Sequence, residues 1–248
     1  MNPVVGAKKQ EAVARIRAAS LDELLDLARA EFGAVSFETA FVGEGSVEIL
    51  QIQDMPAYLD RLAAKSAPGS PVDLPFWAKV WPACLVLASF LARLPLPEDA
   101  VQLEIGSGAG LSGLFAAKHG ASVVISDADP NALLFAQAGI LKNGLADRAS
   151  IALADFTRDR LGRRFDRIFG CETFYRDMDY GPVVDFLLAH LKPGPDHEVL
   201  LCQDSGRRGL SFLDKAKDRF RIRMKEIAYS GERPDEKSSV VLYRLGAL

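Results

Sequence analysis

Glycines and a carboxylate gather in the segment VQLEIGSGAGLSG, residues 101–113, and form the strongest chemical signal in the chain. The apolar start of this segment is typical of a strand, and the glycines that follow it open a helix. Glycine at such a junction lets the backbone turn tightly and lets a ligand lie against main-chain atoms. The spacing of Gly108, Gly110 and Gly113 also fits a dinucleotide fingerprint. Glu104 speaks against that interpretation, because a carboxylate at the strand end repels a pyrophosphate.

Two further carboxylates follow the next two strands. Asp127 ends the segment SVVISD, 23 residues after Glu104. A carboxylate about 20 residues beyond a glycine-rich turn of this kind can accept ribose hydroxyls. Its neighbour Asp129 is either a second ligand residue or the N-cap of the next helix. Asp155 can accept the exocyclic amine of an adenine and Phe156 can cover the ring, although an Asp there is often only a turn residue. Carboxylates at successive strand ends suit a cationic ligand, such as the amino group and sulfonium of S-adenosylmethionine.

A carboxylate and a phenol, Glu172 and Tyr175, follow the segment FDRIFGC. Ligands of open α/β sheets bind beyond the carboxyl ends of the strands, where this pair can orient an amine and accept its proton. The alternative is a Glu at a helix start beside a packed Tyr.

Trp77 and Trp81 precede an apolar helix, where aromatic residues usually pack. Because their segment comes just before the glycine-rich strand, it can also fold over the methionine end of a cofactor as a lid.

The elements that must position these residues alternate between strands and helices. This alternation predicts an α/β fold with a doubly wound, mostly parallel seven-stranded sheet. The last two strands have only a short connection around residues 231–234, so they must form a C-terminal antiparallel hairpin. The expected strands are 101–106, 122–127, 151–155, 165–171, 197–203, 220–230 and 238–245, and the expected helices are 110–120, 131–144, 181–192 and 209–220.

The first 65 residues predict a small α/β extension of this fold. One helix is expected over about 8–31, with Ser20 as a plausible N-cap of its second part. An alternating segment around Gly43 and Gly45 predicts a β-hairpin, and residues 55–65 predict a short helix. Residues 66–75 are rich in Pro, Ser and Gly and make the best linker. We therefore expect an extension over 1–65 and a main domain over 75–248.

Composition excludes several classes of protein. The chain has 248 residues, 49% of them hydrophobic and 25% charged, which is typical of a globular protein and not of a disordered chain or coiled coil. Lys and Arg number 30 against 33 Asp and Glu, which argues mildly against a dedicated nucleic-acid binder. The 3 cysteines and 3 histidines show no disulfide framework and no metal-ligand spacing. Neither a secretory signal nor a membrane span is predicted, so a soluble, cytoplasmic protein is expected.

With these motifs in place, residues from about 75 onward resemble the seven-strand class I S-adenosylmethionine-dependent methyltransferases. The family's acidic-x-Gly-x-Gly-x-Gly motif stands here as Glu104-Ile-Gly106-Ser-Gly108-Ala-Gly110, and the terminal hairpin matches its inserted antiparallel strand. The resemblance implies that S-adenosylmethionine is the cofactor and that no metal is needed. The cofactor-binding residues it implies are Trp81, Glu104, Gly106, Ser107, Gly108, Gly110, Asp127, Ala128, Asp155, Phe156 and Cys171.

A narrower resemblance concerns the methyl acceptor. The segment PFWAKVWPACLVLASFL, followed by the glycine motif, is similar to the protein-lysine methyltransferases that include the enzyme acting on the electron-transfer flavoprotein β subunit. Their Asp-x-x-Tyr motif stands here as Glu172-Thr-Phe-Tyr175, and Phe156 stands where they usually carry Trp. The resemblance implies a lysine of a protein as acceptor, with Glu172 and Tyr175 as catalytic residues. A small-molecule N- or O-methyltransferase, a non-catalytic partner subunit and a nicotinamide oxidoreductase are the alternatives.

Overall fold

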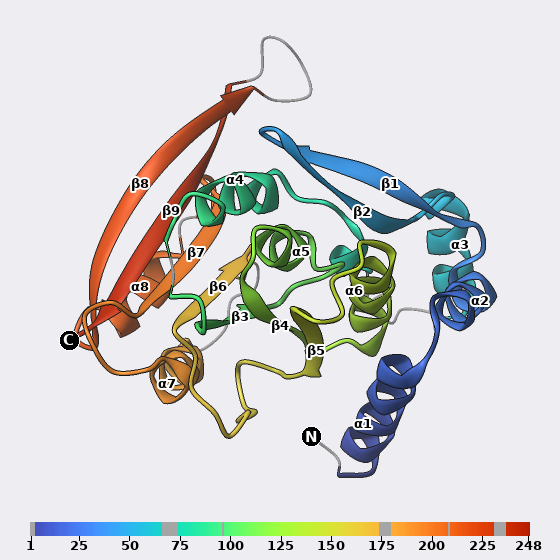
Figure 1. Cartoon of the computed structure of the whole chain (residues 1–248), viewed down its shortest axis with the longest axis horizontal. Helices are drawn as coiled ribbons and strands as arrows, with labels where there is room; N and C mark the ends of the chain where they lie inside the picture. Colours follow the sequence, from blue (N-terminus) through green and yellow to red (C-terminus); the bar gives the residue numbers. More distant parts are fainter. Residues whose placement is uncertain (1–2, 66–73, 96, 174–179, 208, 231–236) are drawn as a thin grey trace.

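A computed structural model describes residues 3–65, 74–95, 97–173, 180–207, 209–230 and 237–248. Its centre is a seven-stranded sheet in the order β5-β4-β3-β6-β7-β9-β8 (Figure 1). The strands β3 to β7 run parallel, whereas β9 is antiparallel to both β7 and β8. The predicted fold class is therefore confirmed. The strands are β3 (Val101–Ile105), β4 (Ser122–Asp127), β5 (Ala149–Leu153), β6 (Arg167–Cys171), β7 (Glu198–Asp204), β8 (Phe220–Ser230) and β9 (Lys237–Ala247).

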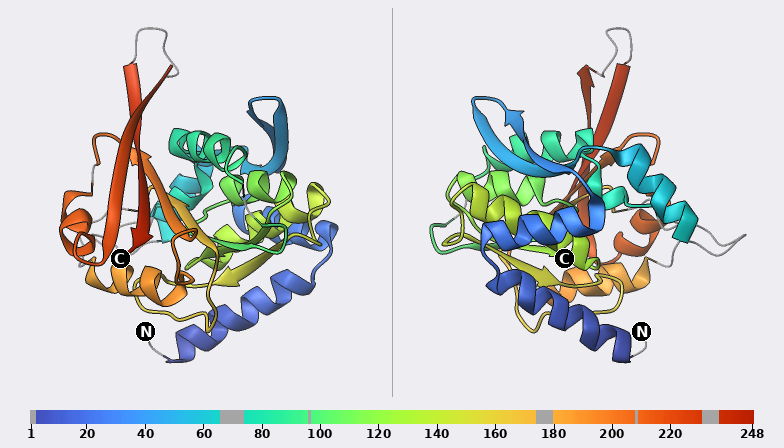
Figure 2. Two further views of the ribbon diagram at one scale, coloured as in Figure 1. Left: turned by 60° about the vertical axis from the view of Figure 1, so that its left-hand side comes forward. Right: turned by 90° about the vertical axis from the view of Figure 1, so that its right-hand side faces the viewer.

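Helices cover both faces of the sheet, as Figures 1 and 2 show. On one face lie α4 (Pro82–Leu91), α5 (Leu111–Lys118) and α6 (Pro130–Lys142), and on the other lie α7 (Gly181–His190) and α8 (Leu210–Ala216). Two apolar cores follow from this arrangement, one on each face. Covered on both faces, β6 is buried throughout and its sequence is nearly all apolar, apart from Arg167, which pairs with Glu198. None of the described helices is long and apolar enough to cross a membrane.

The topological switch point lies between β3 and β6. The chain moves from β3 outward to β4 and β5, and then returns to place β6 on the other side of β3. Adjacent loops leave the sheet in opposite directions at such a point, and ligands of open α/β sheets bind there, beyond the carboxyl ends of the strands. The glycine-rich turn after β3 and the Glu172 segment after β6 flank this position.

The N-terminal region forms two helices instead of the single one expected. They are α1 (Pro3–Ala18) and α2 (Leu21–Phe32), followed by β1 (Val35–Val42), β2 (Gly45–Ile52) and α3 (Met55–Lys65). The prediction of one helix over 8–31 is wrong because Ser20 starts a new helix. Its hydroxyl accepts from the Glu23 amide, and the Glu23 carboxylate accepts from the Ser20 amide at 2.7 Å. This reciprocal capping satisfies backbone groups that a continuous helix would have paired differently. The predicted hairpin and the helix at 55–65 are confirmed.

The N-terminal elements pack against the main sheet domain. Val13 of α1, Leu24 of α2 and Leu50 of β2 are fully buried in the same core as Leu114 and Phe135. Figure 2 shows α1 and α2 lying beside α6 and β5. The proposed linker at 66–75 falls mostly outside the described residues.

Candidate active site

The glycine-rich turn after β3 adopts a backbone that other residues rarely take. Gly106, Gly108 and Gly110 have φ angles of +57°, +54° and +79°, all in the left-handed region. At Gly108 a Cβ atom would also lie 2.6 Å from the carbonyl oxygen of Trp77. The turn therefore requires glycine both for its conformation and for the close approach of the segment before α4. Ser107 holds the turn to the sheet, because its amide donates to the carbonyl of Ser126 at 3.0 Å.

Glu104 lies beneath this turn with its side chain directed toward α5. It is buried, and its Oε2 accepts a hydrogen bond from the Gly113 amide at 3.1 Å. A Cβ at Gly113 would lie 2.4 Å from that oxygen. Gly113 thus makes room for the carboxylate, which explains the glycine that sequence alone left as a dinucleotide signal. Burial raises the pKa of Glu104 well above its usual value, and Glu104 forms no ion pair within the described residues.

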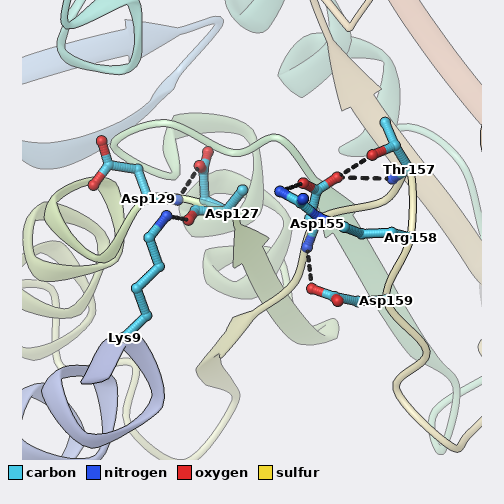
Figure 3. A network of polar contacts seen from close by, with 8 residues as sticks. Lys9, Asp127, Asp129, Asp155, Thr157, Arg158 and Asp159 are labelled. Carbon is cyan, nitrogen blue, oxygen red and sulfur yellow. Dashed lines mark hydrogen bonds and ion pairs between the residues drawn. The ribbon is translucent and has the colours of Figure 1, made fainter. Parts of the chain in front are cut away.

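Asp127 is held at the end of β4 by two backbone amides. Its Oδ2 accepts from Gly108 and its Oδ1 from Asp129, each at 2.9 Å. Burial raises its pKa to about 6. Asp129 caps α6, since its carboxylate accepts from the Asn131 amide. The structure therefore separates the two acids, with Asp127 facing the glycine turn and Asp129 at the helix start (Figure 3).

The N-terminal helix α1 reaches the loop between these two acids. The Lys9 ammonium group donates to the carbonyl oxygen of Ala128 at 2.9 Å (Figure 3). Arg17, two turns further along α1, donates to the carbonyl of Ile151 at 2.9 Å. A part of the chain outside the main domain thus contacts the loop after β4 and the backbone of β5. No sequence motif pointed to Lys9, because a single lysine in a polar helix does not stand out from its neighbours.

Asp155 organises the turn that follows β5. Its Oδ1 accepts from the Thr157 amide at 3.0 Å and from the Thr157 hydroxyl at 2.5 Å, and its Oδ2 pairs with Arg158 (Figure 3). Partial burial works against ionisation, but the hydrogen bonds from Thr157 and the charge of Arg158 lower the pKa of Asp155. The turn also brings the ring of Phe156 over the glycine turn, where a Cβ on Gly106 would lie 3.3 Å from the ring.

Glu172, directly after β6, has a strained backbone. Its φ of +53° makes it the one described residue other than glycine with positive φ. Its amide donates to the Cys202 carbonyl, and its Oε1 accepts from the Asp204 amide, each at 2.9 Å. Its Oε2 is buried without a hydrogen-bond partner, as is the hydroxyl of the neighbouring Thr173. Tyr175, the other predicted catalytic residue, lies outside the described residues.

The two tryptophans before α4 have different surroundings. Trp77 packs edge-to-face on Phe32 and Phe135, with ring centroids 5.5 Å and 5.0 Å apart. Trp81 is only half-buried, and two cations lie over its ring: the Lys79 ammonium at 4.5 Å and the Arg207 guanidinium at 5.3 Å. Trp77 is therefore a packing residue whose backbone covers Gly108, whereas Trp81 presents a polar, partly open face. Sequence reasoning missed Lys79 and Arg207.

Three cysteines distant in sequence converge behind the site. Cys171 and Cys202 are paired across β6 and β7, and Cys84 of α4 lies close to both. All three are free thiols. Burial raises the pKa of both Cys171 and Cys202, so they stay neutral. Cys171 also lies 3.8 Å from the hydroxyl of Ser112. Among the described residues no group of three or more His, Cys, Asp or Glu could hold a metal.

These residues fit a ligand that carries a pair of hydroxyls and, further along the molecule, positive charge. The Asp127 carboxylate has lone pairs left after its two amide bonds and can accept two hydroxyl groups. Glu104 is buried without a cationic partner in the described part of the chain, and a nearby positive ligand would favour its charged form. Gly106, without a side chain of its own, lies beneath the ring of Phe156. S-adenosylmethionine has this distribution of groups.

Comparison with known proteins decides the family. A sequence profile described as lysine methyltransferase matches residues 76–219, more than half of the chain. The chain belongs to the lysine methyltransferase family. Family membership confirms the predicted activity, methyl transfer from S-adenosylmethionine. It also confirms the predicted family resemblance, and the matched residues include the glycine motif and the segment before it.

Curated relatives of this methyltransferase act on two kinds of side chain. It is 31% identical to the protein N-lysine methyltransferase METTL21A of Danio rerio over 164 residues, which cover 63% of this chain and 73% of that protein. It is 34% identical to the histone-arginine methyltransferase METTL23 of Mus musculus over 112 residues, 42% of this chain and 44% of that one. The chain thus spans less than half of the METTL23 protein.

Solved structures share the fold of this methyltransferase at low sequence identity. TYW2 of P. horikoshii, solved with MeSAdo, is 18% identical with a TM-score of 0.55, covering 87% of this chain and 73% of that one. The N-methyltransferase NodS of Bradyrhizobium japonicum, solved with S-adenosyl-L-homocysteine, is 20% identical with a TM-score of 0.51, covering 78% and 99%. These likenesses support the methyltransferase fold.

Proposed function

We propose that this chain methylates the side-chain amine of a lysine in a protein. The observation that carries the proposal is Glu172, a buried carboxylate held in a strained backbone at the switch point, with one oxygen free of hydrogen bonds. Strained backbone persists where the surrounding structure enforces it, and such residues cluster at functional sites. A carboxylate with a free oxygen can orient an amine and accept its proton. The N-lysine activity of the relative METTL21A supports the same acceptor.

The cofactor would lie along the carboxyl edge from β3 to β5. We assign the methionine part to Glu104 and to the turn of Gly106, Ser107, Gly108 and Gly110. We assign the ribose to Asp127 and Ala128, and the adenine to Asp155 and Phe156. Trp81 and Cys171 would flank the end that carries the methyl group. When bound, S-adenosylmethionine supplies a methyl group on a positively charged sulfur.

The acceptor residues must deliver an uncharged amine in line with that methyl group. Methyl transfer is a displacement, so the nitrogen must approach opposite the leaving sulfur with its lone pair free. Lysine is protonated at neutral pH, so the site must remove a proton before transfer. Glu172 would accept it, directly or through water. Tyr175 would assist in orienting the amine.

The proposal can be tested by following radiolabelled methyl groups into a cell lysate. The protein is incubated with labelled S-adenosylmethionine and lysate, and labelled proteins are separated and hydrolysed to amino acids. Methyl-lysine is the expected product, and it should disappear with Glu172→Gln while S-adenosyl-L-homocysteine still binds. Methyl-arginine would instead assign the acceptor class of the METTL23 relatives. Label only in small molecules would overturn a protein acceptor.

A further inference from the structure

A buried carboxylate, an indole ring and two cations meet beside the switch point. Arg207, in the turn between β7 and α8, places its Nη2 atom 3.4 Å from Oε2 of Glu172, the oxygen that accepts no hydrogen bond, and so forms an ion pair with it. Its guanidinium also lies over the ring of Trp81. Glu172 and Trp81 come from separate parts of the chain, and Arg207 contacts both.

The backbone of Arg207 is fixed to the end of β7. Its amide donates to the carbonyl of Asp204 at 2.9 Å, and its carbonyl accepts from the side chain of the buried Gln203. The preceding turn is closed by Ser239 of β9, whose carbonyl accepts from the Ser205 amide at 3.0 Å. The side chain of Arg207 nonetheless remains 39% exposed. An anchored backbone with a partly open side chain suits a group that must hold a charge in place beside a ligand.

The cations beside Glu172 partly offset the upward effect of burial on its pKa. Burial raises the pKa of Glu172, whereas the Asp204 amide, Arg207 and Lys79 lower it and the Asp204 carboxylate raises it. The thiol of Cys202 also lies near the carboxylate but stays neutral, because burial raises its pKa. Arg207 is the nearest cation to Glu172 among the described residues. Removing its charge should therefore raise the pKa of Glu172 more than removing that of Lys79.

We propose that Arg207, which lies over the indole of Trp81, is a positioning residue for methyl transfer that holds Oε2 of Glu172 in place and charged. The inference rests on the proposed function, since it assigns the acceptor amine to this carboxylate. The positive charge of Arg207 also acts on the acceptor amine. An amine that enters beside a guanidinium and the Lys79 ammonium is favoured in its neutral form, because like charges repel. The neutral amine is the form that attacks.

The first test measures Glu172 directly and needs no acceptor. The carboxyl carbons of glutamate are labelled with carbon-13, and the Glu172 signal is identified by its absence in Glu172→Gln. Arg207→Gln should raise the pKa of Glu172 by about one unit, the lower end of the effect of an opposite charge at this range. Arg207→Lys should restore most of the shift. Arg223→Gln, an exposed arginine on β8, serves as the matched control. An unchanged Glu172 titration in Arg207→Gln would overturn the inference.

The second test measures methylation of lysate protein across pH. In Arg207→Gln the acid limb of the pH–rate profile should move to higher pH by about one unit. The rate should fall roughly tenfold at the low-pH end of that limb and recover at alkaline pH. Affinity for S-adenosyl-L-homocysteine should stay unchanged. A loss that is equal at every pH would mean a purely structural role and would overturn the inference. A shifted Glu172 titration without any lysine methylation would reject the proposed function and leave the contact of Arg207 with Glu172 established.

Discussion

At the scale of single residues, Asp127 shows how the fold prepares a carboxylate for a ligand. Two amides fix both of its oxygens, and burial raises its pKa to about 6 from an ordinary value of 3.8. The folded protein therefore takes up this proton at higher pH than the unfolded chain does. The contribution of Asp127 to stability accordingly declines as pH rises from about 4 to about 6, while its ability to accept two hydroxyls increases.

The titration of Asp127 gives a prediction for cofactor affinity. Affinity for S-adenosyl-L-homocysteine should fall as pH drops below about 6, because protonation removes acceptor capacity from Asp127. Asp127→Asn should weaken binding at pH 7.5 by about 1–3 kcal/mol and lose that pH dependence. Calorimetric titrations from pH 5 to pH 8 measure both effects. Affinity in Asp127→Asn equal to that of the parent chain would remove Asp127 from the ribose site.

A second residue-scale prediction concerns Gly113. Gly113→Ala places a methyl group 2.4 Å from Glu104 Oε2 and 2.7 Å from a side-chain carbon of Ile125. We expect a loss of about 1–3 kcal/mol in the free energy of unfolding, typical of an overpacked core, together with weaker cofactor binding through the displaced carboxylate. Gly246→Ala is the matched control, because nothing lies within 4 Å of its added carbon. Denaturant unfolding of both variants and of the parent decides the point. Equal stability of all three would show that Glu104 moves freely.

At the scale of elements, α1 links the N-terminal region to the ribose loop. The hydrogen bond from Lys9 to Ala128 joins residues that lie 119 positions apart. It holds the segment between Asp127 and Asp129, which the cofactor must contact under the proposed assignment. Val13 and Ile16 of the same helix are buried, so apolar packing fixes α1 while Lys9 connects it to the site.

We predict that Lys9→Met weakens cofactor binding three- to tenfold. The substitution keeps a flexible chain of similar length but removes the charged donor, and a hydrogen bond to a charged group at a partly exposed position is worth about 1 kcal/mol. Lys8→Met is the matched control, since Lys8 is an exposed neighbour on α1. Thermal-shift titration with S-adenosyl-L-homocysteine compares the two variants. A similar affinity in both would show that α1 supports the fold without contributing to the ribose loop.

Elements with strong local patterns could be predicted from the sequence, and contacts between distant segments could not. The alternation of apolar strands and helices from 101 to 216 predicts the sheet, and the short connection before β9 predicts its antiparallel end. The break between α1 and α2 was missed, although Ser20 and Glu23 carry the capping pattern that causes it. The strand-end acids were found because each follows a strand. Lys9 and Arg207 reach the site only through tertiary packing, which leaves no local pattern.

At the scale of the whole molecule, the N-terminal elements and the sheet domain share one core. Phe32 of α2 contacts Trp77 and Phe135, with ring centroids 5.5 Å and 5.2 Å away. The helix α6 therefore has one side on the sheet and another on α1, α2 and β2. Separating the two regions would expose large aromatic surfaces on both.

The shared core predicts that the full chain unfolds in a single cooperative transition. A chain that begins at residue 75 should lose the burial of the outer side of α6 and unfold at least 10 °C lower, or aggregate, since each kcal/mol shifts the melting temperature by several degrees. Differential scanning calorimetry of the full chain and of the shortened chain tests this. Two separate transitions, or a shortened chain with the parent's melting temperature, would support independent domains at the proposed boundary.

The left-handed backbone at Glu172 has a consequence for the evolution of related chains. A residue with a Cβ atom is disfavoured at a φ of +53°, and glycine or asparagine would occupy the same position more easily. Under the proposed function, the use of the carboxylate offsets this disadvantage. A lineage that kept the fold but no longer transferred methyl groups would be released from that selection and should drift toward glycine or asparagine there. The residue at this one position would then separate active members from those that have become binding partners.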